Sequence, residues 1–220
     1  MCVILIADQK RLSPTLIRQA VNANPDGNGL AWIENRKVCF RKAVTLDDVE
    51  DLASELPLPY VFHARIATVG GVKPGLCHPF PLDGRLNPTQ LVGRTPKGVL
   101  FHNGHWSAWK QYVNNPTGEY SDSRVMAELV SAFGPDVIQD HVTDSQRVVL
   151  VTPKGVTRYG AGWTEVSKGI HASNTCYLRK LDLRFKTPTT TRWDDIDIAE
   201  YDDDIDAADI AAVQRAFRLR

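Results

Sequence analysis

The 220-residue sequence has no long hydrophobic run, no paired cysteine motif and no excess of charge of either sign. No stretch approaches the ~20 apolar residues that a helix needs to cross a bilayer. No basic region precedes the apolar residues 2–7, as a secretory signal would require. The four cysteines are widely spaced, which favours reduced thiols in the cytoplasm over disulfides or a structural zinc site. The histidines lack metal-ligand spacing, so we expect neither a metal nor a cofactor.

Charge is balanced overall but unevenly distributed. The chain has 26 basic and 26 acidic residues, and nine of the acidic ones lie within residues 194–209, where no lysine or arginine occurs. Zero net charge creates no global field for nucleic acid, so neither nucleic acid nor a membrane is an expected partner. We expect one domain at residues 1–190 and an acidic, partly helical tail at residues 191–220. The tail is interpreted as a solvated extension, with an autoinhibitory cover, a docking helix or a mimic of nucleic-acid charge as alternatives.

Hydrophobic spacing predicts an α+β chain with helices outside the sheets, because strands and helices do not alternate strictly. Runs of β-branched and aromatic residues between turns predict strands, and Ser or Thr before helically spaced apolar residues predicts helices. The strands are expected at residues 2–7, 30–34, 37–43, 60–68, 98–104, 147–152, 155–160, 162–166 and 175–181. The helices are expected at residues 14–21, 45–56, 121–133 and 205–217, and a loop rich in proline and glycine at residues 73–97.

Cys2 is a candidate nucleophile because only Met1 precedes it. Removal of Met1 would leave a thiol and a free α-amine on one residue. The pKa of an α-amine is about 7.7–8.0, so near neutral pH it can accept the thiol proton. The alternative is an ordinary buried cysteine at the start of a strand.

Polar residues near two strand ends and at one helix start also suit an active site. Alternation places His63, Arg65 and Ala67 on one face of the strand at 60–68, where the arginine needs an anion such as a carboxylate. Asn103 and Gly104 can direct two N–H donors at an oxyanion, or form a hairpin turn. Asp122 either caps a helix or accepts an ammonium group. For each of these residues taken alone, both the role in an active site and the purely structural role remain open.

The order of these motifs is more specific than any one of them. Cys2 is followed by NPDGNG at 24–29, HARIAT at 63–68, HPF at 78–80, LFHNG at 100–104 and SDS at 121–123. Over about residues 2–180 this series resembles the class II glutamine amidotransferases, particularly small stand-alone members, including those of phages and bacteria. The resemblance implies the fold of the N-terminal-nucleophile hydrolases, a four-layer αββα sandwich.

The resemblance also implies how the nucleophile works. Cys2 would form a γ-glutamyl thioester, with its own α-amine as the base. Asn103 and Gly104 would form the oxyanion hole. The turn at residues 24–29 is similar to a glycine-containing loop that lies near the nucleophile in the family.

For the substrate, the resemblance implies recognition at both ends of free L-glutamine. Arg65 would bind the α-carboxylate, with Thr68 supporting the same end, and Asp122 would bind the α-ammonium. Val69 departs from the family, since many members have histidine at this position. Asn174 is a further candidate that closes the pocket from a later strand.

Three functions follow from these residues. The first is a glutaminase or glutamine amidotransferase domain that passes ammonia to a separate synthetase or transferase partner, or acts as a stand-alone hydrolase. The second is an amidohydrolase of the same fold that cleaves another amide, in which case Arg65 and Asp122 need not both face the pocket. The third is a catalytically idle binding protein.

Overall fold

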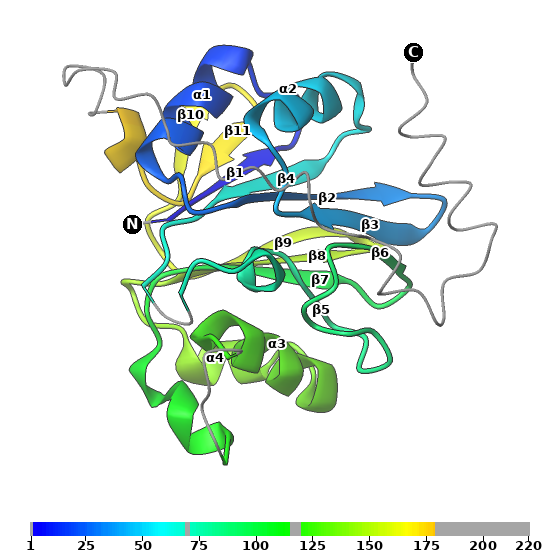
Figure 1. Cartoon of the computed structure of the whole chain (residues 1–220), viewed down its shortest axis with the longest axis vertical. Coiled ribbons are helices and arrows are strands. Elements are labelled where there is room, and N and C mark those ends of the chain that lie inside the picture. The colour runs from blue at the N-terminus through cyan, green and yellow to red at the C-terminus, as the bar shows by residue number, and fades with distance from the viewer. Residues whose placement is uncertain (1, 69–70, 115–119, 179–220) are drawn as a thin grey trace. The chain divides into compact units, whose positions relative to one another are not determined.

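The computed structural model describes residues 2–68, 71–114 and 120–178. Figure 1 shows the arrangement of their helices and strands. The elements in chain order are β1 (Val3–Ala7), α1 (Pro14–Ala23), β2 (Asn28–Glu34), β3 (Lys37–Lys42), α2 (Leu46–Glu55), β4 (Tyr60–Ala64), η1 (Pro74–Leu76), β5 (Phe80–Pro81), β6 (Val92–Thr95), β7 (Val99–Asn103), η2 (Ser107–Tyr112), α3 (Asp122–Phe133), α4 (Val137–His141), β8 (Arg147–Thr152), β9 (Gly155–Tyr159), β10 (Thr164–Ser167) and β11 (Ile170–Ala172). The described part of the chain is therefore of the α+β class, as the sequence predicts.

The strands form two antiparallel sheets. The first has the order β10-β11-β1-β4-β2-β3-β6, and the second has the order β5-β7-β8-β9. β1 lies between β11 and β4, with Val3 opposite Ala64 and Leu5 opposite Ala172. This register puts Cys2, which precedes β1, beside Arg65, which follows β4. The end of β11 lies close to both.

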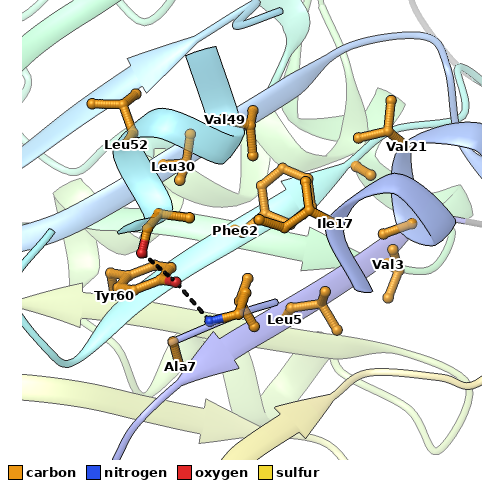
Figure 2. Close-up of a cluster of buried hydrophobic side chains, with 14 of the residues drawn as sticks. Val3, Leu5, Ala7, Ile17, Val21, Leu30, Val49, Leu52, Tyr60 and Phe62 are labelled. Carbon is orange, nitrogen blue, oxygen red and sulfur yellow. Dashed lines mark hydrogen bonds between the residues drawn. The ribbon is translucent and has the colours of Figure 1, made fainter. Parts of the chain in front are cut away.

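Helices α1 and α2 pack on one face of the first sheet, as the upper part of Figure 1 shows. The predicted caps hold both helices: the Ser13 side chain accepts from the Leu16 N–H, and the Thr45 side chain accepts from the Asp48 N–H. Figure 2 shows the buried side chains beneath these helices. Within this cluster the Tyr60 hydroxyl donates to the Ala53 carbonyl at 3.1 Å and accepts from the Leu12 N–H at 2.9 Å.

A second apolar cluster joins the two sheets. Because side chains alternate along a strand, Val3 and Leu5 of β1 face the helices while Ile4 and Ile6 pack toward the second sheet. Phe101 of β7 and Val149 of β8 supply part of the opposite side of this cluster. The even-numbered side of β1 therefore faces the end of β7, where two predicted site residues lie.

A third cluster packs α3 and α4 against the second sheet. α3 is capped by Ser121, whose side chain accepts from the Arg124 N–H at 3.2 Å, so of the two residues that could open this helix Ser121 is the cap and Asp122 is not. The cap fixes Asp122 at the first position of the helix.

Several predicted elements are wrong. The strand predicted over residues 60–68 ends at Ala64, so Arg65 and Ala67 do not continue the face of His63. Beyond Ala64, backbone bonds of Arg65 go to the turn at Asp26 and Gly27, which is not part of a strand. The Pro/Gly-rich loop contains β6, which pairs with β3 at the sheet edge.

Two further predictions concern the C-terminal part of the chain. Residues 176–178 form a short 3-10 turn, with Leu178 N–H bonded to the Thr175 carbonyl, instead of the start of a strand. Residues 179–181 of that predicted strand, the tail at 191–220 and its helix at 205–217 lie outside the described residues.

Candidate active site

Cys2 lies against the loop that follows β4. Its Sγ is 3.3 Å from the Ile66 carbonyl and 3.3 Å from the Ile66 nitrogen, whose N–H it accepts. The contact follows from the register of β1 and β4, which sets Val3 opposite Ala64. The sequence singles out Cys2 and the HARIAT motif that contains Ile66, but their contact depends on strand pairing.

The turn at residues 24–27 supports the same loop. The Arg65 N–H donates to the Gly27 carbonyl at 2.8 Å, and the Asp26 N–H donates to the Arg65 carbonyl at 2.9 Å. The Asp26 side chain also accepts from the Ala67 N–H at 2.9 Å. Gly27 has a φ of 131°, and a Cβ there would overlap the Cys77 Sγ, so both backbone conformation and space require glycine.

Burial, a hydrogen bond and two nearby charges act in different directions on the pKa of the Cys2 thiol. Burial raises the pKa of Cys2, while the hydrogen bond from Ile66 and the charge of Arg65 lower it and the charge of Asp122 raises it. Burial is the largest effect, so the thiol is mostly protonated near neutral pH and needs a base to become a nucleophile. Arg65 and Asp122 belong to different segments, yet both act on this sulfur.

Asn103 and Gly104 lie at the end of β7, in the second sheet. Asn103 is buried, and its Nδ2 donates to the Ser173 Oγ at 2.7 Å. Gly104 has a φ of 146°, and a Cβ there would lie 2.7 Å from the Gln146 Cγ. The hairpin alternative is wrong, because η2, α3 and α4 come between β7 and its partner β8.

Asp122 is buried and fixed by backbone donors. Its Oδ2 accepts from the Trp106 N–H at 3.0 Å, and its Oδ1 accepts from the Ser123 N–H at 2.9 Å. The exposed ring of His105 has its Nδ1 3.7 Å from Oδ2. The carboxylate is therefore held in one orientation from the start of α3, with a titratable ring beside it.

Thr68 differs from the other predicted site residues. It is exposed at the end of the loop after β4, whereas Arg65 in the same loop is buried. Val69, where the sequence departs from the family pattern, lies outside the described residues.

Two adjacent residues after β11 complete the surroundings of Cys2. The Asn174 Nδ2 donates to the Cys2 carbonyl at 2.7 Å. Ser173 accepts from the Ile4 N–H at 2.9 Å and from Asn103. Asn174 is a candidate from the sequence, but Ser173 is not, because the only sequence signal of Ser173 is a position after a three-residue strand that is not predicted.

Three buried histidines lie near the site. His63 and His78 have ring centroids 4.0 Å apart, and the His102 Nδ1 is 3.0 Å from the Ser123 Oγ. Burial lowers the pKa of His63 to about 3 and holds the pKa values of His78 and His102 below their usual range. These three rings are therefore neutral near pH 7. In the part of the chain that the structure describes, no group of three or more His, Cys, Asp or Glu side chains is arranged to hold a metal ion.

Among the described residues, no helix has the length and apolar character needed to cross a bilayer. The described cysteines, which include Cys2, are free thiols.

Comparison with known proteins gives matches in structure but none in sequence. No protein-family model matches the sequence, and no curated protein matches it. In structure, the chain is similar to the allosteric regulatory enzyme of purine biosynthesis, with 18% sequence identity and a TM-score of 0.47. The match covers 81% of this chain and 43% of that chain, so this chain spans less than half of that enzyme's length.

Proposed function

We propose that the chain hydrolyses the side-chain amide of L-glutamine through a thioester on Cys2. It would release glutamate and pass the ammonia to a separate synthetase or transferase. As part of the same proposal, the packing of two sheets between helices is the αββα sandwich of the N-terminal-nucleophile hydrolases, formed within residues 1–190. Free thiols among the described cysteines suit the reducing cytoplasm, where we place the enzyme.

One observation carries the proposal: two opposite charges act on the same thiol. Arg65, after β4, lowers the pKa of Cys2, and Asp122, at the start of α3, raises it. A free amino acid carries an α-carboxylate and an α-ammonium, so it needs one positive and one negative partner. A peptide glutamine has neither charge and would match neither group.

The proposed reaction begins with proton transfer. After removal of Met1, the Cys2 α-amine takes the thiol proton, directly or through water, and Sγ attacks the side-chain carbonyl carbon of glutamine. Asn103 Nδ2 and the Gly104 N–H would stabilise the oxyanion. The C–N bond then breaks as the Cys2 α-ammonium gives its proton to the leaving nitrogen. Ammonia departs and leaves the γ-glutamyl thioester on Cys2.

Water completes the cycle. The free Cys2 α-amine takes a proton from a water molecule, and the oxygen of that water attacks the carbonyl carbon of the thioester. The C–S bond then breaks, and the thiol regains its proton as glutamate forms.

A comparison of substrates tests the proposal. Protein whose intact mass confirms removal of Met1 is incubated with L-glutamine, Nα-acetylglutamine or a glutamine-containing peptide, and glutamate and ammonia release are measured. We expect a clear preference for free L-glutamine. Cleavage of the acylated compounds in preference to glutamine would instead support the amidohydrolase alternative. Lack of hydrolysis, together with lack of Cys2 labelling by a diazoketone analogue of glutamine, would contradict the proposal and favour a binding protein.

Asp122→Asn is expected to weaken recognition of the α-ammonium. A hydrogen bond to a charged group contributes about 1.5–3 kcal/mol, so KM for L-glutamine should rise roughly 10- to 100-fold while kcat changes less. The preference for L-glutamine over Nα-acetylglutamine should fall by a similar factor, and this ratio is insensitive to a general loss of folded protein. The exposed Asp140→Asn in α4 is the matched control, and an unchanged ratio in Asp122→Asn would remove Asp122 from the proposed site.

A further inference from the structure

We propose that Ser173 is a positioning residue that holds Asn103 in register with the strand of the nucleophile. This inference rests on the proposed function and goes beyond it, because it assigns a role to a residue that is neither the nucleophile nor a donor to the substrate.

A single buried hydroxyl joins the two sheets at this point. The Ser173 Oγ accepts from the Ile4 N–H at 2.9 Å and from the Asn103 Nδ2 at 2.7 Å. The Ser173 N–H also donates to the Ile4 carbonyl at 2.9 Å. Ile4 is in β1, two residues after Cys2, and Asn103 ends β7 in the second sheet. Ser173 is only 1% exposed, so water does not replace these bonds easily.

The chemistry of the hydroxyl fixes which end of the Asn103 amide faces the serine. A serine oxygen has two acceptor sites, and the Ile4 N–H and Asn103 Nδ2 use both. One proton of Nδ2 is thereby committed to Ser173, which leaves the second available for an oxyanion. Without this acceptor the amide can rotate by about half a turn and present its carbonyl oxygen, which would repel the oxyanion.

The next residue contacts the nucleophile itself. The Asn174 Nδ2 donates to the Cys2 carbonyl at 2.7 Å. The segment Ser173–Asn174 therefore bonds to β1 on both sides of Val3 and to the end of β7 at the same time. The positions of nucleophile and oxyanion donor are linked through two adjacent residues, and a small misplacement of either reduces the rate steeply.

Ser173→Ala in the full chain tests this role through hydrolysis of L-glutamine. Loss of one oxyanion donor costs about 10²- to 10³-fold in kcat. Misplacing that donor should therefore cost roughly 10- to 100-fold, with KM changed less than about threefold. Ser173→Thr keeps the hydroxyl and should recover most of kcat. If Ser173→Ala fails to fold, Ser173→Cys keeps the shape of the side chain with a slightly larger, weaker acceptor and should show the same loss in kcat.

A double-mutant cycle separates positioning from a purely structural role. If Ser173 acts through Asn103, Ser173→Ala should change kcat less than about twofold when Asn103 is already alanine. The matched control is Thr95→Val, which removes another buried hydroxyl that accepts a backbone N–H, from Lys97, on the edge strand β6. It should leave kcat within about twofold of wild type.

The possible outcomes are distinct. A loss of kcat that is equally large with and without the Asn103 amide would overturn the positioning role, as would an unchanged kcat in Ser173→Ala. Either result, with an active wild-type enzyme, leaves the proposed glutaminase intact. A wild-type protein that does not hydrolyse glutamine or react with the diazoketone analogue overturns the proposed function and this inference with it.

Discussion

Cys2→Ala is expected to lose glutamate release from L-glutamine by more than about a thousandfold in kcat. Alanine removes the only atom that can form the thioester, so water would have to attack the amide directly. The remaining oxyanion donors and binding groups support only slow direct attack by water, as in other enzymes that lose their nucleophile. The measurement is initial-rate glutamate formation by processed protein, with the intact mass recorded for each preparation.

Binding of glutamine is expected to survive this substitution. The backbone N–H of Arg65 donates to the Gly27 carbonyl, and the Asp122 carboxylate accepts from the N–H groups of Trp106 and Ser123, so these contacts do not involve the thiol. Titration calorimetry of Cys2→Ala with L-glutamine should therefore give a Kd within a few-fold of the wild-type KM, where KM reports substrate binding.

The remaining cysteines supply the control for the nucleophile. Cys176 is an exposed free thiol, and Cys176→Ala should keep full activity. Full activity in Cys2→Ala, or its loss in Cys176→Ala alone, would contradict the assignment of the nucleophile.

Acid is expected to destabilise the folded protein strongly below about pH 6.5. Burial lowers the pKa of His63 to about 3 and lowers the pKa values of His78 and His102 in the same direction. The unfolded chain therefore binds more protons than the folded one. The stability from these histidines is fully present above the ordinary histidine pKa of about 6.5. It is lost as the pH falls from there toward the pKa values of the folded state. For His63 this loss is about 1.4 kcal/mol per pH unit in that window, and His78 and His102 contribute with the same sign.

The effect is substantial for a domain of ordinary stability. From pH 7 to pH 5.5 His63 alone should reduce the free energy of unfolding by about 1 kcal/mol, against a typical total of about 5–15 kcal/mol, and His78 and His102 act in the same direction. Lys42 does not obscure the effect. Burial lowers its pKa to about 7 from an ordinary 10.5, so its own contribution changes at higher pH. Equilibrium urea unfolding at a series of pH values measures the slope.

A substitution within the His63–His78 pair tests whether these rings cause the dependence of the free energy of unfolding on pH. His78→Phe keeps an aromatic ring beside His63 and Phe80 but cannot take up a proton. It should make the free energy of unfolding less dependent on pH, and His171→Gln at a partly exposed position is the matched control. A free energy of unfolding that stays constant from pH 7 to pH 5.5 in the wild type would show that these rings are not buried in neutral form.

Local signals in the sequence predicted much of the fold. The caps at Ser13, Thr45 and Ser121 each begin the expected helix, because a side-chain oxygen satisfies an N–H at the helix start. The turn at Asn35 and Arg36 joins β2 and β3, with both residues at positive φ. The strand β6 was missed because its four residues lie in a segment dominated by proline and glycine, where only pairing with β3 makes a strand.

The sequence alone determined the class of the fold and the candidate residues, because capping, alternation and motif order are properties of short segments. The tertiary structure decided which residues meet. Cys2 reaches Ile66 through the register of β1 and β4. Asn103 reaches β1 through Ser173, which is 70 residues away from it in sequence. Such contacts depend on long-range pairing of strands and sheets, and no local pattern of residues encodes that pairing.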